Sequence, residues 1–486
     1  MDINKNTFRD LLKCKKLLYL KQNHIQTEDK NQGFDNQENS QIVRQYASSI
    51  FHDFIDAKSG TKSVKDCFNY TIKLINSCDS VIIKNPAFIF DNLSSSCAYL
   101  VKEDESIDLY EIKCSTKCKQ SVVLDFCFLK YITQNLGINI HSFNVVNINS
   151  GFIKHGEIKS QELLRINDIT ERVETTFEEF DFSILNTELQ EADKNICVHS
   201  KCNSPYPCEY FEYCTKGLEK PNVFDLYNVD FNEKIEYFNQ GKIHFQDLKN
   251  LNKNKIQSLQ VDCFLEDKIH IEKDNLKLFV SNLKYPLYFL DFETTQNIIP
   301  CFENTKPYEQ IPFMFSLHYK KKKNSKLKHK VFIGNGKDQR FLLALKLAFW
   351  IRKKGTIIVF GDSLEKSVLS DLAKRYNLLS KKLNKLHDNI VDLSIPFHKG
   401  FYYSKEMTNS LSLKSVLPSL YPNDESLDYS KLDEIHNGND AMAIYPKIRE
   451  MTKKDKKKTI RELVDYCSLD TFAMVKILEK FEEICS

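Results

Sequence analysis

Hydrophobic positions along the chain form two regions in which strand-like and helix-like patterns follow one another. In the first region, apolar residues recur at helical spacing within residues 1–25, whereas residues 107–113 alternate between apolar and polar side chains. A period of two is typical of a strand with one buried face, and a period near 3.6 is typical of a helix. These patterns predict helices at 1–25, 41–58 and 119–136, and strands at 80–91, 96–102, 107–113 and 140–149.

The second region follows a stretch that is rich in Asn and Lys. Residues 216–280 contain short amphipathic patterns and few long apolar runs, which indicates a helical connector. Beyond it, the patterns predict strands at 285–291, 312–319, 329–334 and 356–360, and helices at 339–352, 363–376 and 456–481. Strands that alternate with helices indicate layered α/β domains. We therefore expect α/β domains over 1–215 and 285–482, joined by a connector over 216–280.

Length and composition indicate a multidomain globular protein but do not identify a binding partner. The chain of 486 residues is too long for one ordinary core, and its formal net charge of +3 means that any basic surface must be local. No stretch approaches the roughly 18 consecutive apolar residues of a membrane span. The first residues also lack the apolar segment of a signal peptide. We therefore expect a cytoplasmic protein with no membrane partner, whose 15 cysteines are mostly free thiols.

Two acids close the most apolar strand of the second region. Asp291 and Glu293 are two residues apart, so their side chains share one face at the end of that strand. Carboxylates held this close repel each other unless a cation lies between them, and Mg²⁺ or Mn²⁺ prefers such oxygen ligands. On its own, the pair is also compatible with two solvated acids at a strand end.

Further acids lie downstream in helical patterns. Tyr466 and Asp470 are four residues apart, so both can reach one site from a single helical face. Glu365 falls in the first turn of the helix that follows the strand at 356–360, where an acid is favoured by the helix dipole in any case. Asp362 is a nearby alternative to Glu365. Each signal alone is compatible with a surface acid.

The order of these motifs resembles the DEDD exonuclease superfamily, in its tyrosine-bearing branch on the RNase H-like fold. The resemblance implies 3′→5′ hydrolysis of phosphodiesters with two divalent cations, Mg²⁺ or Mn²⁺. It implies that Asp291, Glu293 and Asp470 bind metal, that Glu365 supports the second ion, and that Tyr466 orients the attacking water. The superfamily usually has Asp at the position of Glu365, so the second ion would sit differently here.

A closer resemblance extends over residues 285–480. The segments that carry it are 285–294, 311–318, 412–418, 437–441 and 463–471. They are similar to a bacterial family of uncharacterised role that joins a RecB-like nuclease domain with an iron–sulfur cluster to an RNase H-like exonuclease domain. Met314 stands where that family is expected to have glutamine, which affects substrate contacts more than the metal site.

A group of cysteines ends the N-terminal region. Cys202, Cys208 and Cys214 are spaced by five residues each, and three thiolates need a fourth ligand to close a zinc site or a four-iron cluster. Cys14 is the candidate for that ligand, while Cys197 and His199 lie near enough to compete. One early and three late cysteines resemble the iron–sulfur nucleases of the RecB and AddB type. The resemblance favours a 4Fe–4S cluster, with zinc and unligated thiols as alternatives.

The same resemblance predicts a nuclease site in the N-terminal domain, which here is incomplete. Glu111 and Lys113 supply the Glu-x-Lys motif on the strand at 107–113. The preceding strand, at 94–101, has no acid for the metal, and Leu129 stands where glutamine is expected. We therefore expect a degenerate domain of the restriction-endonuclease-like, RecB-like PD-(D/E)xK type that binds nucleic acid without cutting it.

Two basic runs lie in the C-terminal domain. Lysines occupy 320–323, 326, 328 and 330, and five of the six positions at 453–458. They could bind phosphates or could form an ordinary solvated surface. The overall expectation is an exonuclease that acts on DNA or RNA, at single-stranded ends. A non-catalytic nucleic-acid-binding protein and a metal-stapled scaffold for protein partners are the alternatives.

Overall fold

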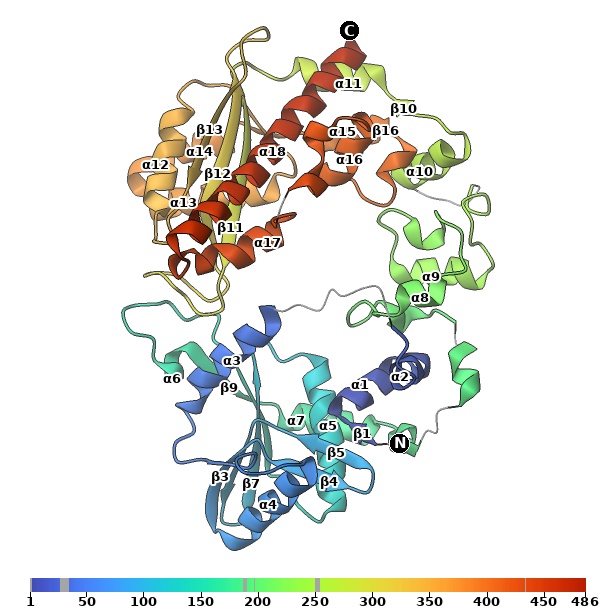
Figure 1. Ribbon diagram of the computed structural model, residues 1–486, viewed down its shortest axis with the longest axis vertical. Coiled ribbons are helices and arrows are strands. Elements are labelled where there is room, and N and C mark those ends of the chain that lie inside the picture. The colour runs from blue at the N-terminus through green and yellow to red at the C-terminus, as the bar shows by residue number, and fades with distance from the viewer. Residues whose placement is uncertain (1, 27–34, 187–189, 196, 250–253, 433) are drawn as a thin grey trace. The chain divides into compact units, whose positions relative to one another are not determined.

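The chain forms two compact units. The computed structural model describes residues 2–26, 35–186, 190–195, 197–249, 254–432 and 434–486 (Figure 1). The first unit comprises Met1–Lys216 together with Asn297–Glu309, and the second comprises Gly217–Gln296 and Gln310–Ser486. Both units mix helices with sheets. None of the described helices combines the length and apolar character that crossing a membrane requires.

The main sheet of the first unit has six strands in the order β2-β3-β6-β7-β8-β9. Strands β3, β6 and β7 pair as an antiparallel meander, and β8 returns parallel to β7 after helix α5. Helix α5 is buried along most of its length, which explains why its sequence is apolar on more than one face. The strand bounds are β2 Ile55–Asp56, β3 Ser80–Lys84, β6 Tyr99–Glu103, β7 Ser106–Lys113, β8 Ser142–Ile148 and β9 Leu164–Asp168.

A small sheet in the order β1-β5-β4 lies beside the first helices of this unit. The helix predicted over 1–25 is two helices, because Cys14 has extended backbone angles (φ −168°, ψ 128°) that separate α1 from α2. The remaining bounds are β1 Ile3–Asn4, α1 Lys5–Lys13, α2 Lys15–Gln22, α3 Asp35–Ser48, α4 Val64–Ser77, β4 Ala87–Phe90, β5 Leu93–Ser96, α5 Gln120–Asn135, α6 Ser160–Leu163, α7 Thr170–Glu179 and α8 Phe211–Thr215.

The second unit is built on a five-stranded sheet in the order β13-β12-β11-β14-β15. Strand β12 runs antiparallel to both β11 and β13, whereas β14 and β15 run parallel to β11. Helix α18 spans 33 residues and packs against β11 and β12. The strand bounds are β11 Leu287–Gln296, β12 Gln310–Lys320, β13 Lys328–Ile333, β14 Thr356–Val359 and β15 Ile390–Asp392, with a small pair β10 His270–Ile271 and β16 Tyr402–Tyr403.

Helices cover this sheet and fill the segment that precedes it. Their bounds are α9 Phe231–Asn239, α10 Lys255–Leu265, α11 Lys273–Ser281, α12 Arg340–Trp350, α13 Ser363–Arg375, α14 Asn377–His387, α15 Ile395–His398, α16 Leu413–Leu420, α17 Gly438–Ile444 and α18 Lys453–Cys485. The segment expected as a separate connector groups with the second unit, because α10 and α11 contribute buried residues to that unit's core.

Candidate functional site

Successive side chains of β11 point to opposite faces of the sheet, which pack against two different hydrophobic cores. Leu290 and Phe292 point into the core formed with α12 and α13, whereas Phe289 belongs to the core beneath α18. Asp291 and Glu293 follow Phe289 on the α18 side. The register with β12 shifts directly after Glu293, a bulge of the kind that re-aims side chains at functional sites.

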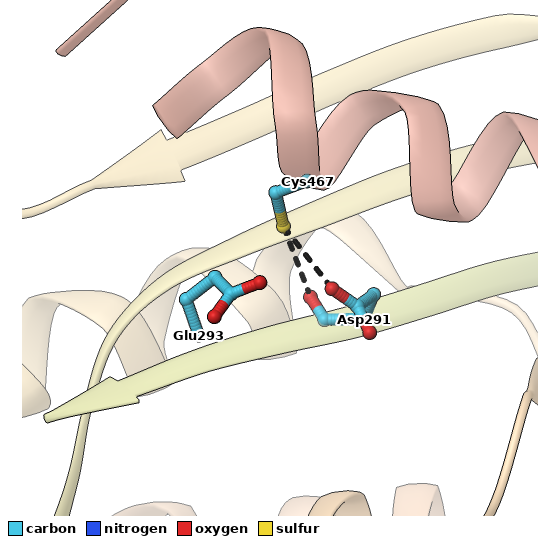
Figure 2. Close-up of side chains that lie close together, drawn as sticks. All are labelled: Asp291, Glu293 and Cys467. Carbon is cyan, nitrogen blue, oxygen red and sulfur yellow. Dashed lines mark hydrogen bonds between the residues drawn. The ribbon is translucent and has the colours of Figure 1, made fainter. Parts of the chain in front are cut away.

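Helix α18 brings three further side chains to the same place. Tyr466, Cys467 and Asp470 are at most 7% exposed. The Sγ atom of Cys467 lies 3.3 Å from Oδ2 of Asp291 (Figure 2). Within the described ranges, Asp291, Glu293 and Cys467 form the one group of three or more His, Cys, Asp or Glu residues whose ligand atoms all lie within 4.8 Å. Cys467 was not expected at the site.

Glu365 approaches the pair on β11 from the first turn of α13. Its side chain is buried and accepts a hydrogen bond from the backbone N–H of Phe292, between the two acids of β11. The second carboxylate oxygen, Oε2, has no hydrogen-bond partner among the described residues. Asp362 instead forms an ion pair with Lys366, with 37% of its side chain exposed. The geometry thus favours Glu365 over Asp362.

Burial raises the pKa of each of the four acids, and neighbouring carboxylates add to the effect at Asp291, Glu293 and Glu365. Burial raises the pKa of Asp291 well above its usual range, and the charges of Asp470, Glu293 and Glu365 raise it further. Burial likewise raises the pKa of Glu293 and that of Glu365 to about 8. The pKa of Asp470 rises to about 6 for the same reason, against hydrogen bonds from Tyr429 and Tyr466. Such a cluster holds an excess of negative charge that a cation would relieve.

Two residues that the sequence analysis did not single out complete the site. Tyr429 donates a hydrogen bond to Asp470, and its ring lies edge-on to that of Tyr466. The Nζ atom of Lys414 lies 5.0 Å from the ring centre of Tyr429 and 4.9 Å from that of Tyr466. The positive charge of Lys414 lowers the pKa values of Glu293 and Asp470. Lys414 is therefore the cation of the acid cluster.

A cavity of about 550 Å³ opens onto these residues. Asp291, Asp470, Tyr466 and Lys414 line it together with residues of the segment between β16 and α16. Lys414 is the only Lys or Arg among the described lining residues. A space of this size accommodates a ligand of several rings or groups, with acids and one ammonium at its wall.

A buried polar network fixes α18 against the sheet. The hydroxyl of Thr471, next to Asp470, lies 2.7 Å from that of Ser316 and 2.8 Å from Nδ1 of His318. Ser316 is the β12 residue directly opposite Asp291. Burial lowers the pKa of His318 to about 3, so the ring is neutral and can share these hydrogen bonds. The network therefore sets the position of α18 relative to β11.

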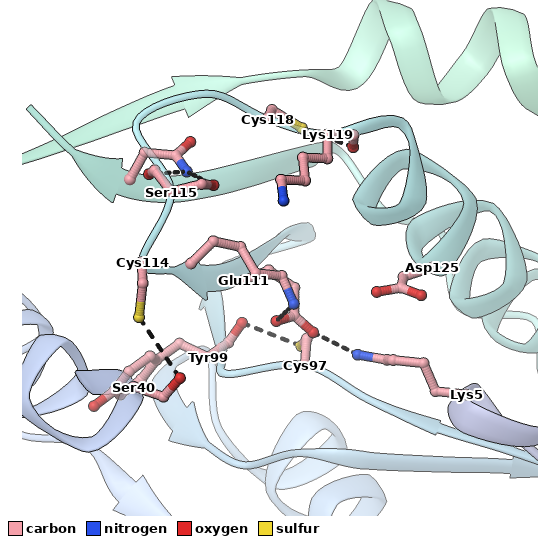
Figure 3. Close-up of polar contacts among 12 residues, drawn as sticks. Lys5, Ser40, Cys97, Tyr99, Glu111, Cys114, Ser115, Cys118, Lys119 and Asp125 are labelled. Carbon is pink, nitrogen blue, oxygen red and sulfur yellow. Dashed lines mark hydrogen bonds and ion pairs between the residues drawn. The ribbon is translucent and has the colours of Figure 1, made fainter. Parts of the chain in front are cut away.

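Glu111 and Lys113 lie on β7 in the first unit, as the strand pattern predicts. Both oxygens of Glu111 are occupied, by Lys5 at 2.5 Å and by Lys113 at 3.1 Å (Figure 3 shows the contact with Lys5). Burial alone would raise the pKa of Glu111, but the two ammonium groups hold it at about 2. Two lysines therefore occupy the places from which a metal ion would bind this carboxylate. The structure adds Lys5, which the sequence analysis did not consider.

The four cysteines predicted as a cluster lie within electrostatic reach of one another in the first unit. The backbone N–H of Cys208 donates to the carbonyl of Cys202 at 2.7 Å, which closes the loop between them. Burial raises the pKa values of the Cys202, Cys208 and Cys214 thiols, and each also responds to the charge of Cys14. Cys197, in contrast, is exposed.

The basic runs are partly neutralised. The lysines at 321–323 and 326 lie in the turn between β12 and β13, while Lys320 pairs with Glu479. Lys458, in the run at the start of α18, pairs with Glu434 and Glu462. These contacts favour a solvated surface for part of each run.

One segment of the chain matches a protein-family model. Residues 288–412, which include Asp291, Glu293 and Glu365, match the family model described as a domain of unknown function (DUF2779). Searches of curated proteins and of solved structures gave no match.

Proposed function

We propose that the protein is a metal-dependent nuclease whose second unit removes nucleotides from the 3′ ends of single-stranded DNA or RNA. The observation that carries the proposal is the cluster of Asp291, Glu293, Glu365 and Asp470. Four buried acids with raised pKa values, of which Asp291 and Asp470 line a cavity, form a ligand set suited to two hard cations.

The residues present fit Mg²⁺ or Mn²⁺. The donors are carboxylate oxygens, and the buried Oε2 of Glu365, which has no hydrogen-bond partner among the described residues, is available to a cation. When bound, such cations polarise a phosphate and lower the pKa of a coordinated water. Asp291, Glu293 and Asp470 would hold them, with Glu365 as the support of the second ion.

The remaining side chains orient the reacting groups. Tyr429 and Tyr466 both donate to Asp470 and so fix its carboxylate, and a Tyr466 hydroxyl freed from that bond could align the attacking water. Lys414 supplies positive charge at the cavity wall, where a scissile phosphate would develop negative charge. The tyrosines are positioning groups in this scheme, and Lys414 stabilises the transition state.

Topology supports the two fold assignments that the proposal uses. In the second unit, the middle strand pairs antiparallel with the second strand and parallel with the fourth, which is the arrangement of an RNase H-like sheet. In the first unit, a three-stranded meander followed by a helix and a parallel strand is the arrangement of a RecB-like nuclease core. With Glu111 saturated by lysines, that core is proposed to bind nucleic acid without hydrolysis.

We also propose that Cys14, Cys202, Cys208 and Cys214 hold a 4Fe–4S cluster. A Zn–S distance of about 2.3 Å puts the thiolates of a tetrahedral zinc site about 3.8 Å apart. No three of these cysteines are among the described groups within 4.8 Å of one another. A 4Fe–4S cluster binds its four thiolates at separate iron corners, so it does not require the thiols to be that close together.

The test is digestion of 3′- and 5′-labelled single-stranded DNA and RNA with Mn²⁺, using anaerobically purified full-length chain. Asp291→Asn removes one metal ligand, and Asp371→Asn is its matched control, since Asp371 is an exposed residue of α13 that pairs with Lys374. We expect stepwise shortening from the 3′ end with the wild type and the control. Even outer-shell changes cost 10–100-fold in metal sites, so Asp291→Asn should reduce the rate by more than about 100-fold. Equal rates in all three proteins would refute the assignment.

A further inference from the structure

A cavity in the first unit lies outside the acid cluster and is lined by residues of the opposite charge. It measures about 740 Å³ and lies where three segments meet: the start of α1, the start of α4, and strand β5. Strand β1 pairs parallel with β5, Asn4 beside Ser94, so the first residue of α1 is held against the serines of β5. We call it the Lys5 cavity, defined by Lys5, Lys58, Lys62, Ser94, Ser95 and Ser96.

Three lysines and no acid are among the described residues that line the Lys5 cavity. Lys58 and Lys62 are exposed and have no ion-pair partner among the described residues. The nearby carboxylates of Asp56 and Asp66 accept hydrogen bonds from the backbone N–H groups of Lys58 and Lys62. Lys58 and Lys62 therefore present ammonium groups without an ion-pair partner among the described residues, which disfavour a metal cation as ligand and favour an anion.

Ser95 supplies an independent sign of a missing ligand. The residue is 6% exposed and lines the cavity, yet its hydroxyl oxygen has no hydrogen-bond partner among the described residues. A buried hydroxyl without a partner costs roughly 1–3 kcal/mol, so native structures usually satisfy it with protein, water or ligand. Its neighbours Ser94 and Ser96 also line the cavity, with side chains on the opposite face of β5.

The two helices strengthen the preference for an anion. The residues at the N-terminal ends of α1 and α4, helices of 9 and 14 residues, both line the cavity. The N-terminal end of a helix carries partial positive charge and favours negative groups. A group with several acceptor oxygens can meet lysines and serines at the same time, and phosphate is the common biological group with that geometry.

We propose that the Lys5 cavity binds a phosphate group, either of a nucleic-acid strand or of a free nucleotide. Lys5 would be shared between the phosphate and Glu111, so the lysine that fills the place of a metal also forms the floor of a binding site. The choice of nucleic acid as one source rests on the proposed function, whereas the phosphate chemistry does not. The volume is large enough for a whole nucleotide.

The experiment is lysine acylation of the full-length chain in EDTA, read by mass spectrometry. The probes are a single-stranded oligonucleotide, adenosine monophosphate and inorganic phosphate, each added to saturation. Lys65 and Lys73 are exposed lysines of α4 that do not line the cavity, and they serve as internal controls. We expect a bound phosphate to slow acylation of Lys58 and Lys62 by about fivefold, with less than about twofold change at the controls. Protection by the oligonucleotide but not by the monophosphate identifies a strand as the source, and the reverse identifies a nucleotide.

Affinity provides the second measurement. Lys58→Gln/Lys62→Gln should weaken binding of the protecting probe by about tenfold, and Lys65→Gln/Lys73→Gln should leave it within about twofold. No selective protection, or equal losses in both double variants, would overturn the proposal. EDTA removes cleavage from the measurement, so this result and the exonuclease test can fail independently.

Discussion

The hydroxyl of Tyr429 donates a hydrogen bond to Oδ1 of Asp470 at 2.5 Å. Tyr429 belongs to a short 3₁₀ turn, Tyr429–Lys431, whereas Asp470 belongs to α18. The bond therefore connects an irregular segment to the helix that carries Asp470, one of the four acids of the cluster. It also lowers the pKa of Asp470, against the larger effect of burial.

Tyr429→Phe removes this bond and leaves the ring in place. Because the pKa of Asp470 should then rise, and its carboxylate should lose orientation, we expect metal affinity to fall by about 10–100-fold. The measurement is the Mn²⁺ concentration that gives half-maximal thermal stabilisation. Tyr421→Phe is the matched control, since Tyr421 donates to the Lys476 carbonyl and touches no acid of the cluster. Identical Mn²⁺ dependence in both variants would show that the bond is structural only.

Lys414→Gln tests the effect of the Lys414 ammonium group on the acid cluster. The variant loses the charge that lowers the pKa values of Glu293 and Asp470, so the acidic limb of the pH–rate profile should move to higher pH. Loss of one preorganised electrostatic group should reduce cleavage by about 100-fold. Lys431→Gln makes the same charge change at a residue that is 51% exposed and paired with Glu425. A profile that changes in height without shifting would assign Lys414 to substrate binding alone.

Metal binding should depend on pH with a definite sign. The pKa values of Glu293 and Glu365 rise from 4.5 to about 8 on folding, so the folded protein without metal holds protons that the unfolded chain releases. Its free energy of unfolding therefore falls as pH rises from about 4.5 to about 8. A divalent cation replaces those protons, so the stabilisation by Mn²⁺ should grow over the same range.

Thermal unfolding in EDTA and in Mn²⁺ at a series of pH values checks this dependence. Asp291→Asn is the comparison, and its Mn²⁺ increment should be small at every pH. An increment in the wild type that stays constant between about pH 6 and about pH 8 would contradict the coupling of protons and metal.

Glu111→Gln tests the ion pairs that replace a metal in the first unit. Glu111 is 6% exposed in its side chain, and its removal leaves Lys5 and Lys113 without their carboxylate. Breaking a buried pair on one side costs about 3–5 kcal/mol, so the first unit should unfold at markedly lower denaturant concentration. Hydrogen exchange along β7 measures the effect, with exposed Glu103→Gln on β6 as control. Mn²⁺-dependent cleavage by the intact variant should be retained below its unfolding transition.

The cysteine cluster predicts the metal content of the purified protein. Wild type should contain about four iron atoms per chain with the visible absorption of a 4Fe–4S cluster, and Cys208→Ser should lose most of both. Cys197→Ser should keep them, because Cys197 is exposed and apart from the four thiols. About one zinc per chain and no iron would select the alternative metal.

Regular elements made the acids of the second unit predictable. Strand alternation gave the shared face of Asp291 and Glu293, and helical spacing gave that of Tyr466 and Asp470. The sequence pattern did not predict Tyr429 and Lys414 as site residues, because the segment between β16 and α18 consists of short helices and turns without a sustained hydrophobic period. Only tertiary packing brings them to the acids.

In the first unit, the sequence did not predict the partner of Glu111, because that partner is distant along the chain. The ion pair of Lys5 with Glu111 spans 106 positions, and nothing near Glu111 in the sequence indicates that a lysine replaces the missing acid. The break between α1 and α2 was missed for a local reason. Cys14 leaves the helical conformation although the apolar spacing continues across it.

The assignment of residues 297–309 to the first unit makes that unit discontinuous along the chain. Tyr308 donates to the Cys114 carbonyl, and the backbones of Lys154 and Thr305 are hydrogen-bonded. During synthesis, β11 leaves the ribosome before this piece does, and β12 leaves after it. The first unit therefore cannot complete its packing until the chain has been synthesised past β11, and a fragment that ends near residue 216 lacks part of its own packing. Domain-swapping or truncation experiments on this chain need cuts at both ends of the 297–309 segment.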